Sequence, residues 1–230
     1  MSVRAVRPLV VLLSVLLVAG AVARAAEEPE APSKGPDEFK GLKYRTVGLS
    51  ADLFKEMGAA VTILPGGEIV PALDRGLIDA AEFNNPSSDL LLGFQDVSKN
   101  FMVRSHHQQQ ECFEISFNKA KYNALPGELK SILRYASFAA TADQFAVAHD
   151  RYSKDLEAIR ARGVNVIKTP DAVLEAQLKA WDKVIAANQD PFFVKVLASQ
   201  KAWAKRVTPY FHTNNLTTAQ LEVAYKHFFG

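Results

Sequence analysis

Short apolar runs alternate with amphipathic helical stretches between residues 41 and 86. This pattern predicts strands at residues 43–46, 61–64 and 77–83, and helices at residues 52–57 and 68–75. Both helical patterns stop at a glycine, Gly58 and Gly76, where a helix end favours a left-handed residue. Strands that alternate with helices are typical of a parallel sheet covered on its faces. The pattern therefore predicts an α/β fold.

The pattern continues with longer helices toward the C-terminus. A helix within residues 87–98, a strand at 100–103 and a helical turn at 119–125 are predicted, and Phe113, Ile115 and Phe117 alternate with polar residues as in a half-buried strand. Residues 128–162 contain neither glycine nor proline, so they predict one helix of roughly 50 Å. A strand at 164–167 and helices at 170–187, 190–207 and 217–228 complete the prediction.

The N-terminus has the pattern of an exported protein. Residues 1–25 combine a basic start, an uncharged apolar stretch and a small-x-small site, which predicts a signal peptide cleaved near Ala25. Residues 26–40 are rich in proline and charge and predict a flexible linker. We therefore expect a periplasmic location.

The net charge and the cysteine count argue against nucleic-acid binding and against an internal disulfide. Without the three arginines of residues 1–25 the formal charge changes from +2 to −1, so no basic field remains that would attract nucleic acid. The single cysteine, Cys112, cannot form an internal disulfide, which suits a periplasmic protein that needs no covalent staple.

Candidate binding residues gather where the predicted strands end. Arg45 ends the first strand, and Phe83 and Asn85 follow the third, at the edge where parallel sheets bind ligands. A guanidinium grips a carboxylate with two hydrogen bonds, an amide suits a hydroxyl or keto oxygen, and a ring covers an apolar tail. The alternatives are a surface arginine paired with an acid, a turn asparagine before proline and a core phenylalanine.

Several of these segments together resemble a known family. They are GLKYRT (41–46), MGAAV (57–61), GGEIVPAL (66–73), GLIDAAEFNNP (76–86) and ALPGELKSIL (124–133). In this order and spacing they resemble the second lobe of substrate-binding subunits of tripartite ATP-independent periplasmic (TRAP) transporters, in the monocarboxylate and 2-oxoacid branch.

The resemblance implies a periplasmic-binding-protein-like α/β fold that lacks most of the N-terminal lobe. The expected parts are one mostly parallel-sheet lobe that binds ligand (41–126), a long spine helix (127–162), and a strand and helices of an incomplete second lobe (163–230). In relatives these C-terminal helices pack on the first lobe, so we expect exposed apolar area among five aromatic residues: Trp181, Phe192, Phe193, Trp203 and Phe211.

The resemblance also implies a transport function and no enzymatic activity. The chain would capture a small monocarboxylate or 2-oxoacid for TRAP permease subunits, with Arg45 clamping the substrate carboxylate. The backbone of Phe83 and the side chain of Gln108 would hold a substrate-bridging Na⁺ or Ca²⁺, and no other cofactor is implied. Since Gln108 stands where the branch has an acid, its neutral amide would hold a hard cation only weakly.

The absent lobe leaves a second interpretation. The chain would then be a truncated relict or interaction module that docks to a permease or other partner without binding solute. A separate chain that supplies the missing lobe, or a homodimer, would complete the cleft under the first interpretation.

Overall fold

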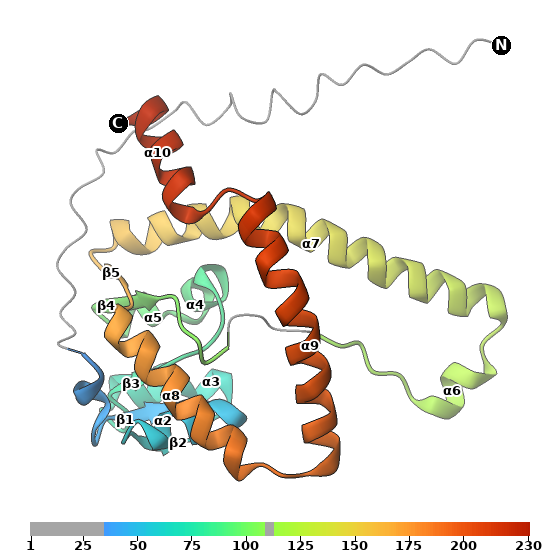
Figure 1. The fold of residues 1–230 in the computed structure, drawn as a ribbon, viewed down its shortest axis with the longest axis horizontal. Coiled ribbons are helices and arrows are strands. Elements are labelled where there is room, and N and C mark those ends of the chain that lie inside the picture. The colour runs from blue at the N-terminus through green and yellow to red at the C-terminus, as the bar shows by residue number, and fades with distance from the viewer. Residues whose placement is uncertain (1–34, 109–112) are drawn as a thin grey trace. The chain divides into compact units, whose positions relative to one another are not determined.

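The computed structural model describes residues 35–108 and 113–230 (Figure 1). The predicted signal peptide (1–25), the linker residues 26–34 and Cys112 lie outside the described residues. The chain divides between Gln189 and Asp190 into two units. We refer to residues 35–189 as the sheet unit and to residues 190–230 as the C-terminal unit.

The first sheet of the sheet unit has three parallel strands in the order β2-β1-β3. These are β1 (Lys43–Arg45), β2 (Ala60–Thr62) and β3 (Ala80–Ala81), connected by α2 (Leu49–Glu56) and α3 (Gly66–Asp74). Gly58 and Gly76 follow these helices with φ of 94° and 67°, a left-handed conformation that favours glycine. The predicted α/β alternation is confirmed.

A second sheet pairs two strands that are distant in the sequence. β4 (Asn100–Val103) and β5 (Asn165–Lys168) are parallel, with Phe101 opposite Val166. Between β3 and β4 lie α4 (Pro86–Leu92) and α5 (Phe94–Val97), and between β4 and β5 lie α6 (Lys119–Ala124) and α7 (Gly127–Ala161). All strands within the described residues are parallel, as predicted, but they form two separate ladders.

The predicted long helix is one continuous element. α7 contains 35 residues and packs against α4. Most of its apolar side chains are nevertheless exposed, including Ile132, Tyr135, Phe138 and Phe145 at 54%, 67%, 57% and 74%. Only its last turns join a core, where Ile159 packs with Val164 and Val166.

The main core forms between α2 and α8 (Asp171–Ala187), which cover the first sheet. Leu53 and Phe54 of α2 are fully buried against Val173 of α8, with Tyr44 of β1 completing the cluster. A second cluster joins three buried residues of α3 and the turn after it, Ile69, Ala72 and Ile78. These two clusters fix the ends of β1 and β3 relative to each other.

The predicted linker ends earlier than expected. Residues Pro36–Phe39 form a 3₁₀ helix, η1, and the ring of Phe39 stacks on Phe54 at 5.6 Å between centroids. The single aromatic residue of the linker therefore belongs to the core, because it covers apolar surface that α2 leaves open.

The predicted strand at residues 113–117 is wrong. Residues 113–118 have no regular structure, and Phe113, Ile115 and Phe117 are 66%, 72% and 50% exposed. Alternating polarity indicates that a strand would have one apolar face, but a strand also needs a neighbour for its backbone groups. No strand of the described chain pairs with this segment.

The C-terminal unit contains α9 (Pro191–Asn214) and α10 (Thr218–Phe229), each capped by a side chain. Phe192, Trp203 and Phe211 of α9 are 74%, 58% and 51% exposed, which confirms the expected apolar exposure at these positions. Phe193 is only half-buried, and Trp181 of α8 is half-buried against the main core, so the expectation was wrong for these two.

No helix within residues 35–108 and 113–230 combines the length and apolar character that crossing a membrane requires.

Candidate functional site

Arg45 lies at the carboxyl end of β1, between the ends of β2 and β3. It pairs in register with Thr62 on one side and Ala81 on the other, and it is only 4% exposed. The main core holds the strand from one face through the adjacent Tyr44, and burial raises the pKa of the Tyr44 phenol. The structure therefore places the guanidinium at the predicted edge, but beneath the surface.

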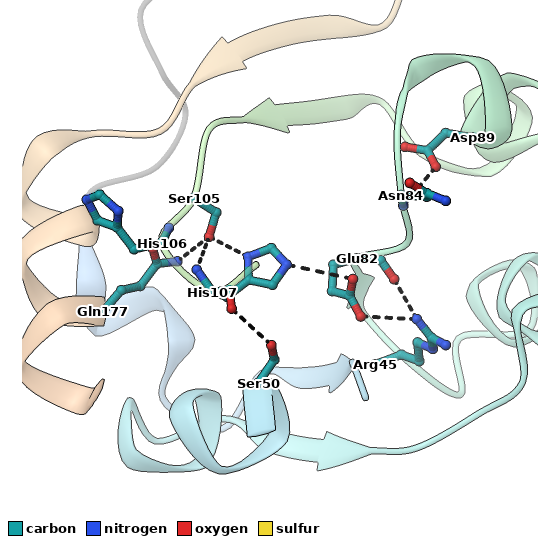
Figure 2. Close-up of polar contacts among 9 residues, drawn as sticks. All are labelled: Arg45, Ser50, Glu82, Asn84, Asp89, Ser105, His106, His107 and Gln177. Carbon is teal, nitrogen blue, oxygen red and sulfur yellow. Dashed lines mark hydrogen bonds and ion pairs between the residues drawn. The ribbon is translucent and has the colours of Figure 1, made fainter. Parts of the chain in front are cut away.

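The guanidinium of Arg45 already donates to three acceptor atoms of its own chain. Its Nε and Nη2 donate to the carbonyl oxygen of Leu64 at 2.9 and 2.8 Å, and its Nη1 donates to the carbonyl oxygen of Glu82 at 2.7 Å. Nη1 also donates to the Glu82 carboxylate at 3.1 Å, and this ion pair is buried, with side-chain exposures of 5% and 12% (Figure 2). The carboxylate that Arg45 binds in this structure is therefore one from its own chain.

Glu82 is a site residue that sequence reasoning missed. It directly follows β3, and its second carboxylate oxygen lies 3.7 Å from Nε2 of His107. The signal was available in principle, because a residue just after β3 lies beside the residue that ends β1 in a parallel pair. A charged residue next to a strand end is, however, usually solvated.

A short loop after β4 supports the far side of Glu82. Ser105 Oγ contacts Nδ1 of His107 and accepts hydrogen bonds from the backbone N–H of His107 at 3.2 Å and from Gln177 Nε2 at 2.8 Å (Figure 2). Trp181 and Gln177 of α8 also bind the backbone of His106. Ser105, His107 and Glu82 lie next to one another as in a catalytic triad, but the Ser105 hydroxyl accepts two N–H groups and Glu82 is held by Arg45. These three residues therefore form a structural network and are poorly arranged for nucleophilic attack.

Asn85 caps helix α4. Its side-chain oxygen accepts hydrogen bonds from the backbone N–H groups of Ser87 and Ser88, both at 3.1 Å, and its NH₂ group donates to Asn84 at 3.0 Å. These hydrogen bonds agree with the alternative in which Asn85 is a turn residue before proline. Pro86 occupies the first helical position, as proline commonly does. The role of Asn85 toward a solute stays a prediction.

Phe83 belongs to the second apolar cluster. Its ring lies 6.2 Å from that of Phe94 and packs on the cluster that contains Ile69. Gly66 approaches the ring so closely that a Cβ atom there would lie 2.8 Å from it. The ring therefore has a packing role, and its predicted contact with an apolar substrate tail is untested.

A second carboxyl group is buried beside the site. Asp89 of α4 is 7% exposed and accepts a hydrogen bond from the backbone N–H of Asn84 at 3.4 Å (Figure 2). Burial, with a smaller contribution from the nearby Glu82 charge, raises the pKa of Asp89 to about 7, although the hydrogen bond from the Asn84 N–H opposes the shift. A carboxyl with this pKa changes charge near neutral pH.

The residues predicted to hold a cation supply few donors. Gln108 is exposed, and it and the Phe83 carbonyl would contribute two neutral oxygens. Within the described ranges no three His, Cys, Asp or Glu side chains gather as a metal site. Since calcium takes six to eight oxygen ligands, these two positions alone fit a hard cation poorly.

Comparisons with known proteins agree on one family. Residues 13–190 match the model of DctP, bacterial extracellular solute-binding protein family 7. The monocarboxylate 2-oxoacid-binding periplasmic protein all3028 of Nostoc sp. is 28% identical over 80% of this chain and 51% of its own length. The chain thus spans about half the length of the curated relatives it matches.

Solved structures show the same fold. A TRAP periplasmic solute-binding protein from Colwellia psychrerythraea with bound calcium and pyruvate is 27% identical, with a TM-score of 0.69 over 81% of this chain and 57% of its own. One from Pseudoalteromonas atlantica with bound sodium and pyruvate is 25% identical, with a TM-score of 0.66 over 85% and 58%. The chain therefore belongs to the bacterial extracellular solute-binding protein family 7, whose members serve TRAP transport and are not enzymes.

Proposed function

We propose that this chain is a solute-binding component of a TRAP-type carboxylate uptake system that captures a small monocarboxylate or 2-oxoacid. The observation that carries the proposal is the buried Arg45 guanidinium at the carboxyl edge of the first sheet, paired with a carboxylate. A site that holds the Glu82 carboxylate has the donors that a solute carboxylate needs. The pyruvate in two related structures and the name of the Nostoc relative support this solute class.

The proposal places the protein in the periplasm. The signal-peptide pattern of residues 1–25, with cleavage near Ala25, and the periplasmic relatives support this location. The permease subunits of such a system would receive the solute from the loaded protein. In this role Asn85 would contact the solute's keto or hydroxyl oxygen, and Phe83 would line its apolar side.

Isothermal titration calorimetry with pyruvate and lactate tests the proposal. We expect Arg45→Lys to weaken binding at least tenfold, because an ammonium cannot form the paired hydrogen bonds of a guanidinium. Arg75→Lys, at an exposed position after α3, is the matched control and should bind as the wild type does. Equal binding by the wild type and a folded Arg45→Lys variant would refute the role of Arg45.

A bridging Na⁺ or Ca²⁺, held by the backbone of Phe83 and the side chain of Gln108, is a separate part of this proposal. The cations in the two pyruvate-bound relatives support it. If the cation contributes, millimolar calcium should tighten pyruvate binding relative to EDTA, and Gln108→Ala should abolish that gain. Identical affinity in calcium and in EDTA would exclude the cation.

The exposed apolar side chains of α7 favour a second candidate, an interaction module that docks to a partner without binding solute. Affinity capture from a periplasmic extract with the wild type and with Phe138→Asp tests this candidate. Docking would be supported if the wild type captures a partner that Phe138→Asp does not capture, and if neither pyruvate nor lactate gives a heat of binding in calorimetry. Measurable acid binding would reject the claim that the chain binds no solute.

A further inference from the structure

The hydrogen bonds of Arg45 leave too few donors for a solute. A guanidinium has five N–H groups, and four hydrogen bonds to Leu64 and Glu82 are already present. A bidentate grip on a carboxylate needs two N–H groups on one edge. With Arg45 only 4% exposed, a solute carboxylate can reach such an edge only if a present acceptor leaves.

The three acceptors differ in how easily they can leave. The carbonyl oxygens of Leu64 and Glu82 are backbone groups beside the sheet, and moving them would leave buried polar groups without partners. The Glu82 carboxylate is at the end of a rotatable side chain, and its other oxygen already faces His107 at 3.7 Å. The side chain of Glu82 is therefore the acceptor that can be exchanged.

We propose that a solute carboxylate binds by replacing the Glu82 carboxylate on Arg45, and that Glu82 thereby determines specificity for monoanions. This inference rests on the proposed function and goes further, because it assigns a selective role to a residue inside the site. When no solute is bound, the Glu82 carboxylate balances the positive charge of Arg45. A bound monoanion takes over that role. A dianion brings a second negative charge close to the released Glu82 carboxylate, with Asp89 as a further acid nearby.

The expected selectivity follows from the charges. Two like charges about 6 Å apart at an effective dielectric constant of about 20 repel enough to lower affinity about a hundredfold. Glu82→Gln keeps the shape of the side chain but replaces the ion pair with a hydrogen bond from the guanidinium to a neutral amide oxygen, which is a weaker competitor for Arg45. The variant should therefore bind pyruvate about tenfold more tightly, and succinate, which also escapes the repulsion, about a thousandfold more tightly.

The same exchange can be tested with two ligands that differ by one charge. Succinate and its monomethyl ester share a skeleton and differ by one charge. The wild type should bind the monomethyl ester more tightly than succinate, and Glu82→Gln should remove most of that preference. Glu82→Asp, which keeps the charge, should retain the preference.

Calorimetry of the full chain in calcium and in EDTA, with circular dichroism to verify folding, supplies the measurements. The control is Asp79→Asn, which removes a carboxylate from a 3.2 Å pair with Lys43 at the opposite end of β1; it should leave both affinities unchanged. Weaker pyruvate binding by folded Glu82→Gln, or equal wild-type affinity for succinate and its ester, would overturn the exchange while the proposed function stands. No binding of any acid by either protein would overturn both.

Discussion

The buried carboxyl group of Asp89 makes a quantitative prediction about stability. Its pKa is about 7 in the folded protein against an ordinary value of 3.8, because burial disfavours the charged form. When a folded-state pKa is raised, the stability contribution is fully present below pH 4 and is lost as the pH rises to about 7. A shift of about three units corresponds to at most about 4 kcal/mol of unfolding free energy at pH 8.

The substitution Asp89→Asn isolates this contribution. The amide cannot ionise, and its oxygen can still accept the hydrogen bond from the Asn84 N–H. Between pH 5 and pH 8 the wild type should lose about 3 kcal/mol more unfolding free energy than the variant does. Two other acids are present in both proteins: the neighbouring Glu82, and Asp155, which accepts a hydrogen bond from Ser87 Oγ. Their contributions to the pH dependence of the unfolding free energy therefore cancel in the comparison.

Urea denaturation followed by circular dichroism at the two pH values measures this difference. Asp96→Asn is the matched control, because Asp96 is an exposed carboxylate, 61% accessible, whose 3.2 Å pair with Arg162 contributes at most about 1 kcal/mol. The control should follow the wild type at both pH values. A folded Asp89→Asn protein with the same pH dependence as the wild type would show that Asp89 is not held neutral by its surroundings.

Three further substitutions test the elements that position the site. Leu53→Ala should destabilise the protein by about 2–5 kcal/mol in urea denaturation because Leu53 is fully buried, whereas Leu91→Ala, 77% exposed, should change it by less than about 0.5 kcal/mol. Asn85→Ala should remove about 1 kcal/mol by uncapping α4, and Asn85→Asp should restore it because the accepting oxygen returns. Gly66→Ala should cost about 1–3 kcal/mol through contact with the ring of Phe83, and a double-mutant cycle with Phe83→Leu should show that most of this loss depends on the ring.

Local signals in the sequence were sufficient to predict most of the helices and strands of the sheet unit. Apolar runs that end at glycines indicate where strands and helices stop, and the backbone at Gly58 and Gly76 has the positive φ that such stops require. The parallel pairing of β1 with β3 then brings Arg45 to the predicted edge. These features were predictable because each depends on a few neighbouring residues.

Features that depend on distant neighbours were not predictable in this way. The alternation of Phe113, Ile115 and Phe117 describes one side of a strand, but it contains no information about the strand that would lie beside it. The pairing of Glu82 with Arg45 joins residues 37 positions apart and exists only because two strand ends meet. Burial of an acid at that point follows from the tertiary structure rather than from the pattern around residue 82.

The polar groups predicted to contact a solute are the ones that the chain itself satisfies in this structure. The oxygen of Asn85 binds the first N–H groups of α4, and the guanidinium of Arg45 binds Glu82. This is expected of groups at the edge of a core, since a buried donor without an acceptor is destabilising by about 1–3 kcal/mol. A solute that binds here therefore exchanges hydrogen bonds instead of adding them, and the net gain is smaller than the sum of its contacts. Affinity at such a site depends on the difference between the solute carboxylate and Glu82 as partners of Arg45, which is why one conservative change at residue 82 should affect binding more than changes in the surrounding apolar residues.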